Sequence, residues 1–273
     1  MTQRENTMPN EEALTQEERR IRLIRALCAE DPTYRELTVP KDETSQRRLL
    51  RSLMNVRPPR PVSNDFLTLQ DAYLSRETKN RGIVDGAALT PTADDSRIVL
   101  WQGDITRLKT DAIVNAANSA LLGCFQPCHS CIDNIIHTYA GVQLRLACHA
   151  LMTEQGHEEP TGTAKITTAF NLPCRYVLHT VGPIVTGPLT QRHKDQLAAC
   201  YTACLELAAQ KGLTSVAFCC ISTGVFAFPQ EEAAAIAVDT VWGFLNNNPA
   251  SIQQVIFNVF KDEDLAIYQN ILS

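Results

Sequence analysis

The chain lacks any apolar run long enough to cross a membrane. A membrane-spanning helix needs about 20 consecutive apolar residues, and no stretch of the 273 residues approaches that length. The first ten residues are polar and lack the apolar centre of a signal peptide. We therefore expect no membrane association and a cytoplasmic location.

The larger part of the chain also lacks a surplus of basic residues. Residues 1–60 contain 12 of the 25 Lys and Arg residues and 10 of the 30 Asp and Glu residues, which leaves 13 basic against 20 acidic residues in 61–273. Nucleic-acid binding normally uses clustered Lys and Arg to displace counterions from phosphates. The acidic balance therefore argues against a nucleic-acid partner. A phosphate compound would instead be held by backbone N–H groups in turns and at helix starts.

Cysteine, by contrast, is abundant, with ten residues. Cys200 and Cys204 are spaced as on one helix face, and Cys219 and Cys220 lie inside an apolar run. Small secreted proteins use many cysteines for disulfides, but these positions suit reduced residues of a core.

The pattern of apolar residues divides the chain near residue 95. Residues 1–94 predict a helical extension whose first residues are disordered. A capping-box pattern at Thr15 opens one helix, a second contains Leu49 and Met54, and a third covers about 65–77. Residues 89–95 are polar and suit a linker or an exposed loop. None of these segments carries chemistry that we can assign.

Residues 95–273 alternate short β-rich runs with helices, which predicts a single α/β domain. Strands this apolar have to be covered on both faces, so we expect a three-layer α/β/α sandwich around a mixed sheet. The expected strands are 97–102, 112–115, 165–169, 176–181, 215–220 and 254–260, and the expected helices are about 132–155, 190–211, 229–246 and 262–272. Ligands of such sheets gather at the carboxyl ends of the strands.

Three segments near these strand ends suit a nucleotide or sugar ligand. Asp104 could accept a hydrogen bond from a base, although a simple Gly-Asp turn has the same sequence. Asn115 and Asn118 could hydrogen-bond vicinal hydroxyls, or they could form a turn and a helix cap. The small-residue turn from Ile221 to Pro229 could direct N–H groups at a diphosphate, or it could merely connect a strand to a helix that Pro229 could start.

The fourth segment has the spacing of a metal site, because Cys124, Cys128, His129 and Cys131 lie within nine residues. Zinc takes thiolate and imidazole ligands in a tetrahedron, with four protein ligands in structural sites and commonly three in catalytic ones. Cys124, His129 and Cys131 supply three ligands, and Cys128 is a possible fourth. The spacing alone leaves open a catalytic site, a closed structural site and a cysteine-rich loop without a metal.

Together these segments resemble the macrodomains, which bind ADP-ribose, and in particular the zinc-dependent macrodomains that hydrolyse ADP-ribosyl groups from proteins. The resemblance covers roughly residues 95–273, and the helical extension before them is also typical of the zinc-dependent group. It rests on residues 103–106, 111–118, 132–137, 140–141, 160–164, 179–183 and 222–229.

The resemblance implies a binding role for each matching position. Asp104 and the backbone of Ile105 would hold the adenine amino group, and Phe260 would pack against the ring. Asn115 and Asn118 would lie beside the distal ribose, the sugar bonded to the modified side chain. The diphosphate would lie against Gly182, Ser222, Thr223, Gly224, Val225 and Phe226.

The resemblance also implies the catalytic residues. Cys124, His129 and Cys131 would bind one zinc ion per chain, with Cys128 off the metal, in the loop where metal-free relatives have a glycine-rich segment. Asp133 would act as a base or orient the attacking water, and Asn118 would assist it. His137 and His179 suit interior positions more than catalytic ones.

The implied function is a zinc-dependent hydrolase that removes mono-ADP-ribose from modified proteins, at ester linkages to Asp or Glu. Two alternatives remain. The domain could bind ADP-ribose without turnover, as a reader module, which a closed four-ligand zinc site would favour. It could also deacylate O-acetyl-ADP-ribose, or act on a terminal ADP-ribose phosphate, with the same pocket.

Overall fold

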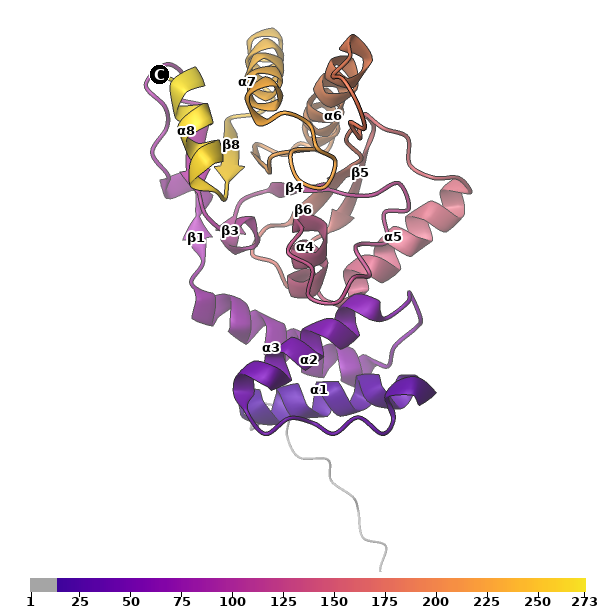
Figure 1. Cartoon of the computed structure of the whole chain (residues 1–273). Coiled ribbons are helices and arrows are strands. Elements are labelled where there is room, and N and C mark those ends of the chain that lie inside the picture. The colour runs from indigo at the N-terminus through magenta and orange to yellow at the C-terminus, as the bar shows by residue number, and fades with distance from the viewer. Residues whose placement is uncertain (1–13) are drawn as a thin grey trace, which may run out of the picture.

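The computed structural model describes residues 14–273 (Figure 1). The first residues of the chain, for which the sequence predicts disorder, lie outside the described residues. Three helices, α1 (Gln16–Glu30), α2 (Glu43–Val56) and α3 (Asn64–Arg81), form a bundle at one end of the molecule (Figure 1). No helix within residues 14–273 is both long enough and apolar enough to span a bilayer.

Each helix of the bundle begins at a side-chain cap. The predicted capping box at Thr15 and Glu18 is confirmed, and Asp42 and Ser63 accept hydrogen bonds from the first turns of α2 and α3. Such caps satisfy N–H groups that have no partner inside the helix. The buried apolar residues of the bundle form a cluster of their own, which Val142 of a later helix joins. The bundle is therefore packed against the rest of the protein.

The rest of the chain is built on a six-stranded mixed sheet, as the sequence predicts. The strands are β2 (Ile98–Gln102), β4 (Ala112–Ala116), β5 (Ala164–Thr168), β6 (Tyr176–Thr180), β7 (Ser215–Phe218) and β8 (Gln254–Val259). Their order is β2-β8-β7-β4-β6-β5, and only β5 runs antiparallel to its neighbour. The carboxyl ends of the other five strands consequently lie along one edge of the sheet.

Helices cover both faces of this sheet and complete the α/β/α sandwich. Figure 1 shows α4 (Ile132–Ala140) and α5 (Val142–Gln155) between the sheet and the bundle, and α6 (Gln191–Gln210) and α7 (Gln230–Asn247) on the far side. The last helix, α8 (Asp262–Ile271), lies beside β8. The four inner strands, β8, β7, β4 and β6, are almost wholly buried between these layers, which explains their continuous apolar sequences.

Two details differ from the sequence prediction. The helix expected over 132–155 is broken at Gly141, whose φ of 95° lies in a region that only glycine adopts readily. A short parallel pair, β1 (Val84–Asp85) with β3 (Leu108–Lys109), was not predicted, since two residues are too few to show a period. This pair joins the segment after α3 to the segment after β2.

Candidate functional site

All the segments with predicted ligand-binding residues lie at one edge of the sheet. They follow β2, β4, β6, β7 and β8, whose carboxyl ends point the same way. Residues that are more than a hundred positions apart in the sequence therefore face one region. This is the edge at which parallel sheets bind their ligands.

The three predicted metal ligands come together in the loop between β4 and α4. The ligand atoms of Cys124, His129 and Cys131 all lie within 4.8 Å of one another, and Cys124 Sγ is 3.7 Å from His129 Nδ1. Two thiols and an imidazole at these separations fit one zinc ion after a small closure of the loop, since zinc bonds sulfur at about 2.3 Å and nitrogen at about 2.0 Å.

Burial raises the pKa of the Cys131 thiol to about 12, and the neighbouring Cys124 contributes in the same direction. Metals bind the thiolate rather than the thiol. A cation at this position would have to stabilise the thiolate itself, as divalent metals do for coordinating thiols. The donor set therefore fits a soft or borderline divalent cation, of which zinc is the common example.

Cys128 lies apart from this group. Its backbone has a φ of 53°, in the left-handed region, and its thiol lies 3.2 Å from the hydroxyl of Ser52 and 3.5 Å from the carbonyl oxygen of Arg48, both on α2. The thiol therefore points towards the helical bundle and away from the other three ligands. The geometry favours three protein ligands over four.

Asp133 lies in the first turn of α4, directly after residues 122–131, which we call the metal-binding loop. Its carboxylate is almost fully buried and accepts hydrogen bonds from Asn115 Nδ2 at 2.8 Å and from Asn118 Nδ2 at 3.3 Å. Burial raises the pKa of Asp133 to about 6, against the opposing effect of the Asn115 hydrogen bond. Asn118 also donates to the carbonyl of Gly123 at 3.2 Å. One amide thus links the metal-binding loop to the carboxylate.

Asn115 has no exposed surface, unlike Asn118. Its Nδ2 atom lies 2.8 Å from Asp133 Oδ1 and 3.2 Å from Nδ1 of the fully buried His179. Asn115 therefore contacts the carboxylate from the protein interior, whereas Asn118 contacts it from a partly exposed position.

The two buried histidines differ in their surroundings. His179 is an interior residue, as the sequence suggested, and Nε2 lies 2.9 Å from Thr167 Oγ1. Burial lowers the pKa of His179 to about 4, so it is neutral at physiological pH. His137 is also buried, its pKa is lowered by burial, and Nε2 lies 3.5 Å from Asp133 Oδ1. Within residues 14–273, neither ring nitrogen of His137 makes a hydrogen bond.

At the same edge of the sheet, after the outer strand β2, Asp104 is held by an arginine that the sequence did not predict. Arg81 at the end of α3 donates to Asp104 Oδ2 at 2.7 Å and to Thr106 Oγ1 at 3.0 Å, and its guanidinium lies over the ring of Tyr139. The other carboxylate oxygen of Asp104 accepts from the backbone N–H of Thr106. The local sequence gives no signal for the Arg81–Asp104 pair, because the two residues are 23 positions apart.

Two further predicted binding residues are Ile105, next to Asp104 in the chain, and Phe260, directly after β8. Ile105 has a buried side chain, so it presents only its backbone. Phe260 follows β8 with 74% of its surface exposed, which leaves the ring free to contact a ligand.

The turn after β7 leaves several backbone N–H groups without a protein acceptor within residues 14–273. Ser222 has a φ of 65°, and its N–H and those of Thr223, Gly224, Val225 and Phe226 donate to no protein acceptor among the described residues. Successive free N–H groups in a turn bind anions without any lysine. Gly182 packs against this turn so closely that an added Cβ would lie 2.0 Å from Ser222 Oγ.

Comparison with known proteins matches this chain to one family. The Macro domain family matches residues 114–237. A protein of Treponema medium named protein-ADP-ribose hydrolase is 57% identical over 264 residues, which cover 95% of this chain and 100% of that protein. A Staphylococcus aureus (strain MRSA252) protein of the same name is 52% identical over 85% of this chain and 87% of its own length.

Solved structures agree with these sequence comparisons. The Oceanobacillus iheyensis macrodomain with ADP is 40% identical, with a TM-score of 0.58 over 64% of this chain and 89% of that one. The Trypanosoma brucei macrodomain in complex with ADP-ribose is 28% identical, with a TM-score of 0.65 over 81% of this chain and 95% of that one.

Proposed function

The chain belongs to the Macro domain family, and from this premise we propose that it is a zinc-dependent protein-ADP-ribose hydrolase. Its substrates would be proteins that carry mono-ADP-ribose on Asp or Glu side chains. The names of the two bacterial relatives support the hydrolase activity. The ester linkage rests on the resemblance of the metal-binding loop to that of the zinc-dependent macrodomains.

One observation carries the enzyme assignment. Asn118 donates to the Gly123 carbonyl and to Asp133, so the metal-binding loop and the buried carboxylate meet at a single side chain. A reader module needs neither a carboxylate held by two amides nor a metal site with three protein ligands. Both features suit a hydrolytic centre, in which a carboxylate accepts a proton from water or orients it.

Residues at the carboxyl ends of the other strands would bind the rest of the substrate. The free N–H groups of residues 222–226 would hold the diphosphate, and Gly182 would shape the same wall of the cleft. Asp104 and the backbone of Ile105 would hold the adenine amino group, with Phe260 against the ring. This arrangement would direct the distal ribose and its ester towards Asn118 and Asp133.

Zinc held by Cys124, His129 and Cys131 would polarise an ester or ribose oxygen, or lower the pKa of a bound water. Asp133 would take the proton of the attacking water, or orient that water while the proton goes to the leaving carboxylate. Asn115 and Asn118 would keep the carboxylate in place. The products are free ADP-ribose and the unmodified acidic side chain.

The deciding experiment combines three measurements on one purified sample. These are the release of ADP-ribose from a protein modified on acidic residues, the same release after treatment with a chelator, and the zinc content per chain. We expect turnover with one zinc per chain and little turnover after chelation. Tight ADP-ribose binding without release would instead identify a reader module, and faster turnover of O-acetyl-ADP-ribose would identify a deacylase.

A further inference from the structure

We propose that α2 of the helical bundle positions the metal-binding loop, through the side chains of Arg51 and Asn55. This inference deepens the proposed function and rests on its zinc site. It implies that the N-terminal helices affect metal binding, although they contribute no metal ligand and no catalytic group to the proposed site.

Arg51 reaches the loop directly and through a second side chain. Its Nη2 atom donates to the carbonyl oxygen of His129 at 2.6 Å and to Asn134 Oδ1 at 2.8 Å. Asn134 is fully buried, and its Nδ2 donates to the carbonyls of Cys124 at 3.3 Å and Gln126 at 2.9 Å. One guanidinium thereby restrains the backbone of two of the three ligand residues, Cys124 and His129.

Asn55 holds the middle of the loop. It is 1% exposed, its Oδ1 accepts from the backbone N–H of Cys128 at 2.9 Å, and its Nδ2 donates to Thr138 Oγ1 at 3.0 Å. Residue 128 has a positive φ, a backbone conformation that is costly for any residue except glycine. The Asn55 hydrogen bond offsets part of that cost. It also keeps the Cys128 thiol turned to Ser52, off the metal.

A third contact joins the start of the same loop to the end of α2. The buried Arg145 of α5 donates to the carbonyl of Leu122 at 2.7 Å and to that of Met54 at 3.1 Å. Its guanidinium also lies over the ring of Phe125, at 4.2 Å from the ring centre. Contacts from α2 and α5 therefore support the loop along most of its length.

The loop depends on such support because it has little regular structure of its own. No helix or strand lies between β4 and α4. Ligands that are already ordered lose less conformational freedom when a metal binds. Groups that orient metal ligands typically change metal affinity by about 10- to 100-fold when they are removed. Arg51 and Asn55 are thus positioning residues, not catalytic ones.

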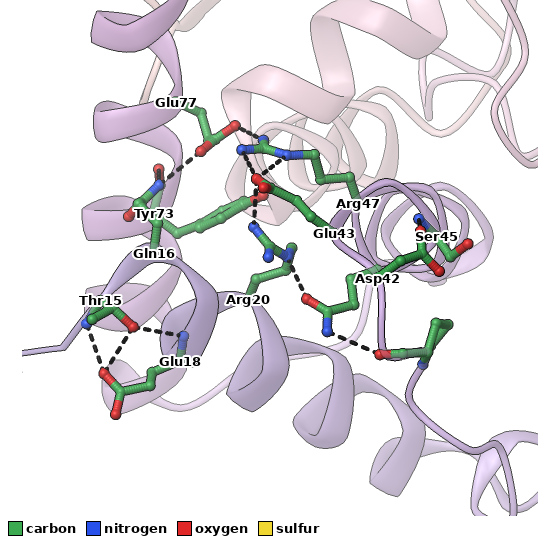
Figure 2. A network of polar contacts seen from close by, with 12 residues as sticks. Thr15, Gln16, Glu18, Arg20, Asp42, Glu43, Ser45, Arg47, Tyr73 and Glu77 are labelled. Carbon is green, nitrogen blue, oxygen red and sulfur yellow. Dashed lines mark hydrogen bonds and ion pairs between the residues drawn. The ribbon is translucent and has the colours of Figure 1, made fainter.

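The test compares two Arg-to-Met substitutions one helical turn apart. Arg51→Met removes the donors to the loop, whereas Arg47→Met removes an arginine that pairs with Glu43 and Glu77 inside the bundle. Figure 2 shows Arg47 turned towards Glu77 of α3, within a network that also contains Arg20. Both variants lose an arginine of α2, but only Arg51→Met loses contacts with the loop.

Three quantities are measured for the wild type, Arg51→Met, Arg51→Lys, Asn55→Ala and Arg47→Met. They are the zinc dissociation constant by competition with a chromophoric chelator, the hydrogen exchange of the amides of residues 124–131 without metal, and the ADP-ribose dissociation constant. We expect Arg51→Met and Asn55→Ala to weaken zinc binding by roughly tenfold or more. Loop exchange should accelerate in both, and ADP-ribose affinity should stay within about twofold.

Arg47→Met should keep the wild-type zinc affinity, and Arg51→Lys should recover part of it because it retains a charged donor. Equal zinc affinity and equal loop exchange in the two Met variants would overturn this inference and leave the proposed function intact. A wild-type protein that binds no zinc would overturn the zinc site itself, and this inference with it. The two failures are therefore distinguishable.

Discussion

The thiol of Cys128 lies 3.2 Å from the hydroxyl of Ser52, so the fourth possible ligand of the cysteine-rich loop points into the interface with α2. The other three ligand atoms lie within 4.8 Å of one another. The positions of the thiols therefore predict which cysteines would bind a metal ion, and a matched pair of substitutions tests this prediction.

Cys131→Ser should lose zinc and hydrolysis, while Cys128→Ser should keep both. Serine preserves the side-chain acceptor by which Cys131 caps α4, so the loss should come from the ligand and not from the helix. We expect zinc affinity to fall by at least about tenfold in Cys131→Ser. Metal analysis and ADP-ribose release are measured together, and loss of zinc in Cys128→Ser would contradict the three-ligand site.

Asp133→Asn should slow hydrolysis by roughly 10²- to 10⁴-fold, the usual range for removing a general base. The amide has nearly the same shape, so zinc content and ADP-ribose affinity should change little. Single-turnover release and an ADP-ribose titration are run on the same preparation. Unchanged release would remove Asp133 from the mechanism, whereas loss of binding as well would indicate a binding role.

Gly182→Ala should weaken ADP-ribose binding. The added Cβ would lie 2.0 Å from Ser222 Oγ and 2.9 Å from Ile221 Cγ2, so the turn that offers its N–H groups has to move. Overpacking of this kind also costs about 1–3 kcal/mol of folding stability. We expect affinity to fall by about tenfold or more by calorimetry.

Gly187→Ala is the matched control for this substitution. Gly187 lies in the same loop between β6 and α6. A Cβ atom added there would have no neighbouring atom within 4 Å. Equal affinities of the two variants would argue against contact between the diphosphate and the turn of residues 222–226.

His179 makes the free energy of unfolding depend on pH. Burial lowers its folded-state pKa to about 4 from the usual 6.5. Between these values the unfolded chain takes up a proton and the folded chain does not. The stability is therefore complete above about pH 6.5 and falls as the pH decreases towards 4. This histidine alone should cost about 2 kcal/mol between pH 7 and pH 5.

Urea unfolding at pH 7 and pH 5, in the presence of a chelator, measures this effect. In His179→Gln the loss of stability between the two pH values should be smaller by about 2 kcal/mol than in the wild type. Replacement of the exposed His149 by Gln controls for the removal of a histidine. An identical pH dependence in His179→Gln and the wild type would show that the pKa of His179 does not differ between the folded and the unfolded chain.

The sequence by itself determined the local structure and the types of residue at the site. Alternation of apolar runs and helical periods was sufficient for the six strands and their order in the chain, because these signals lie within a few residues of one another. The spacing of Cys124, His129 and Cys131 likewise predicted a metal site, since these three ligand types lie close together in the sequence.

The contacts that fix the positions of those residues became visible only in the tertiary structure. The burial of Asn115, the direction of the Cys128 thiol, the pairing of Arg81 with Asp104 and the support of the loop by Arg51 depend on residues 18 to 83 positions apart. Such contacts follow from how α4 packs on the sheet and how α2 and α3 pack against α4, and no periodicity encodes them. The helical bundle, which carried no recognisable chemistry in the sequence, therefore gained its inferred function from the contacts that packing created.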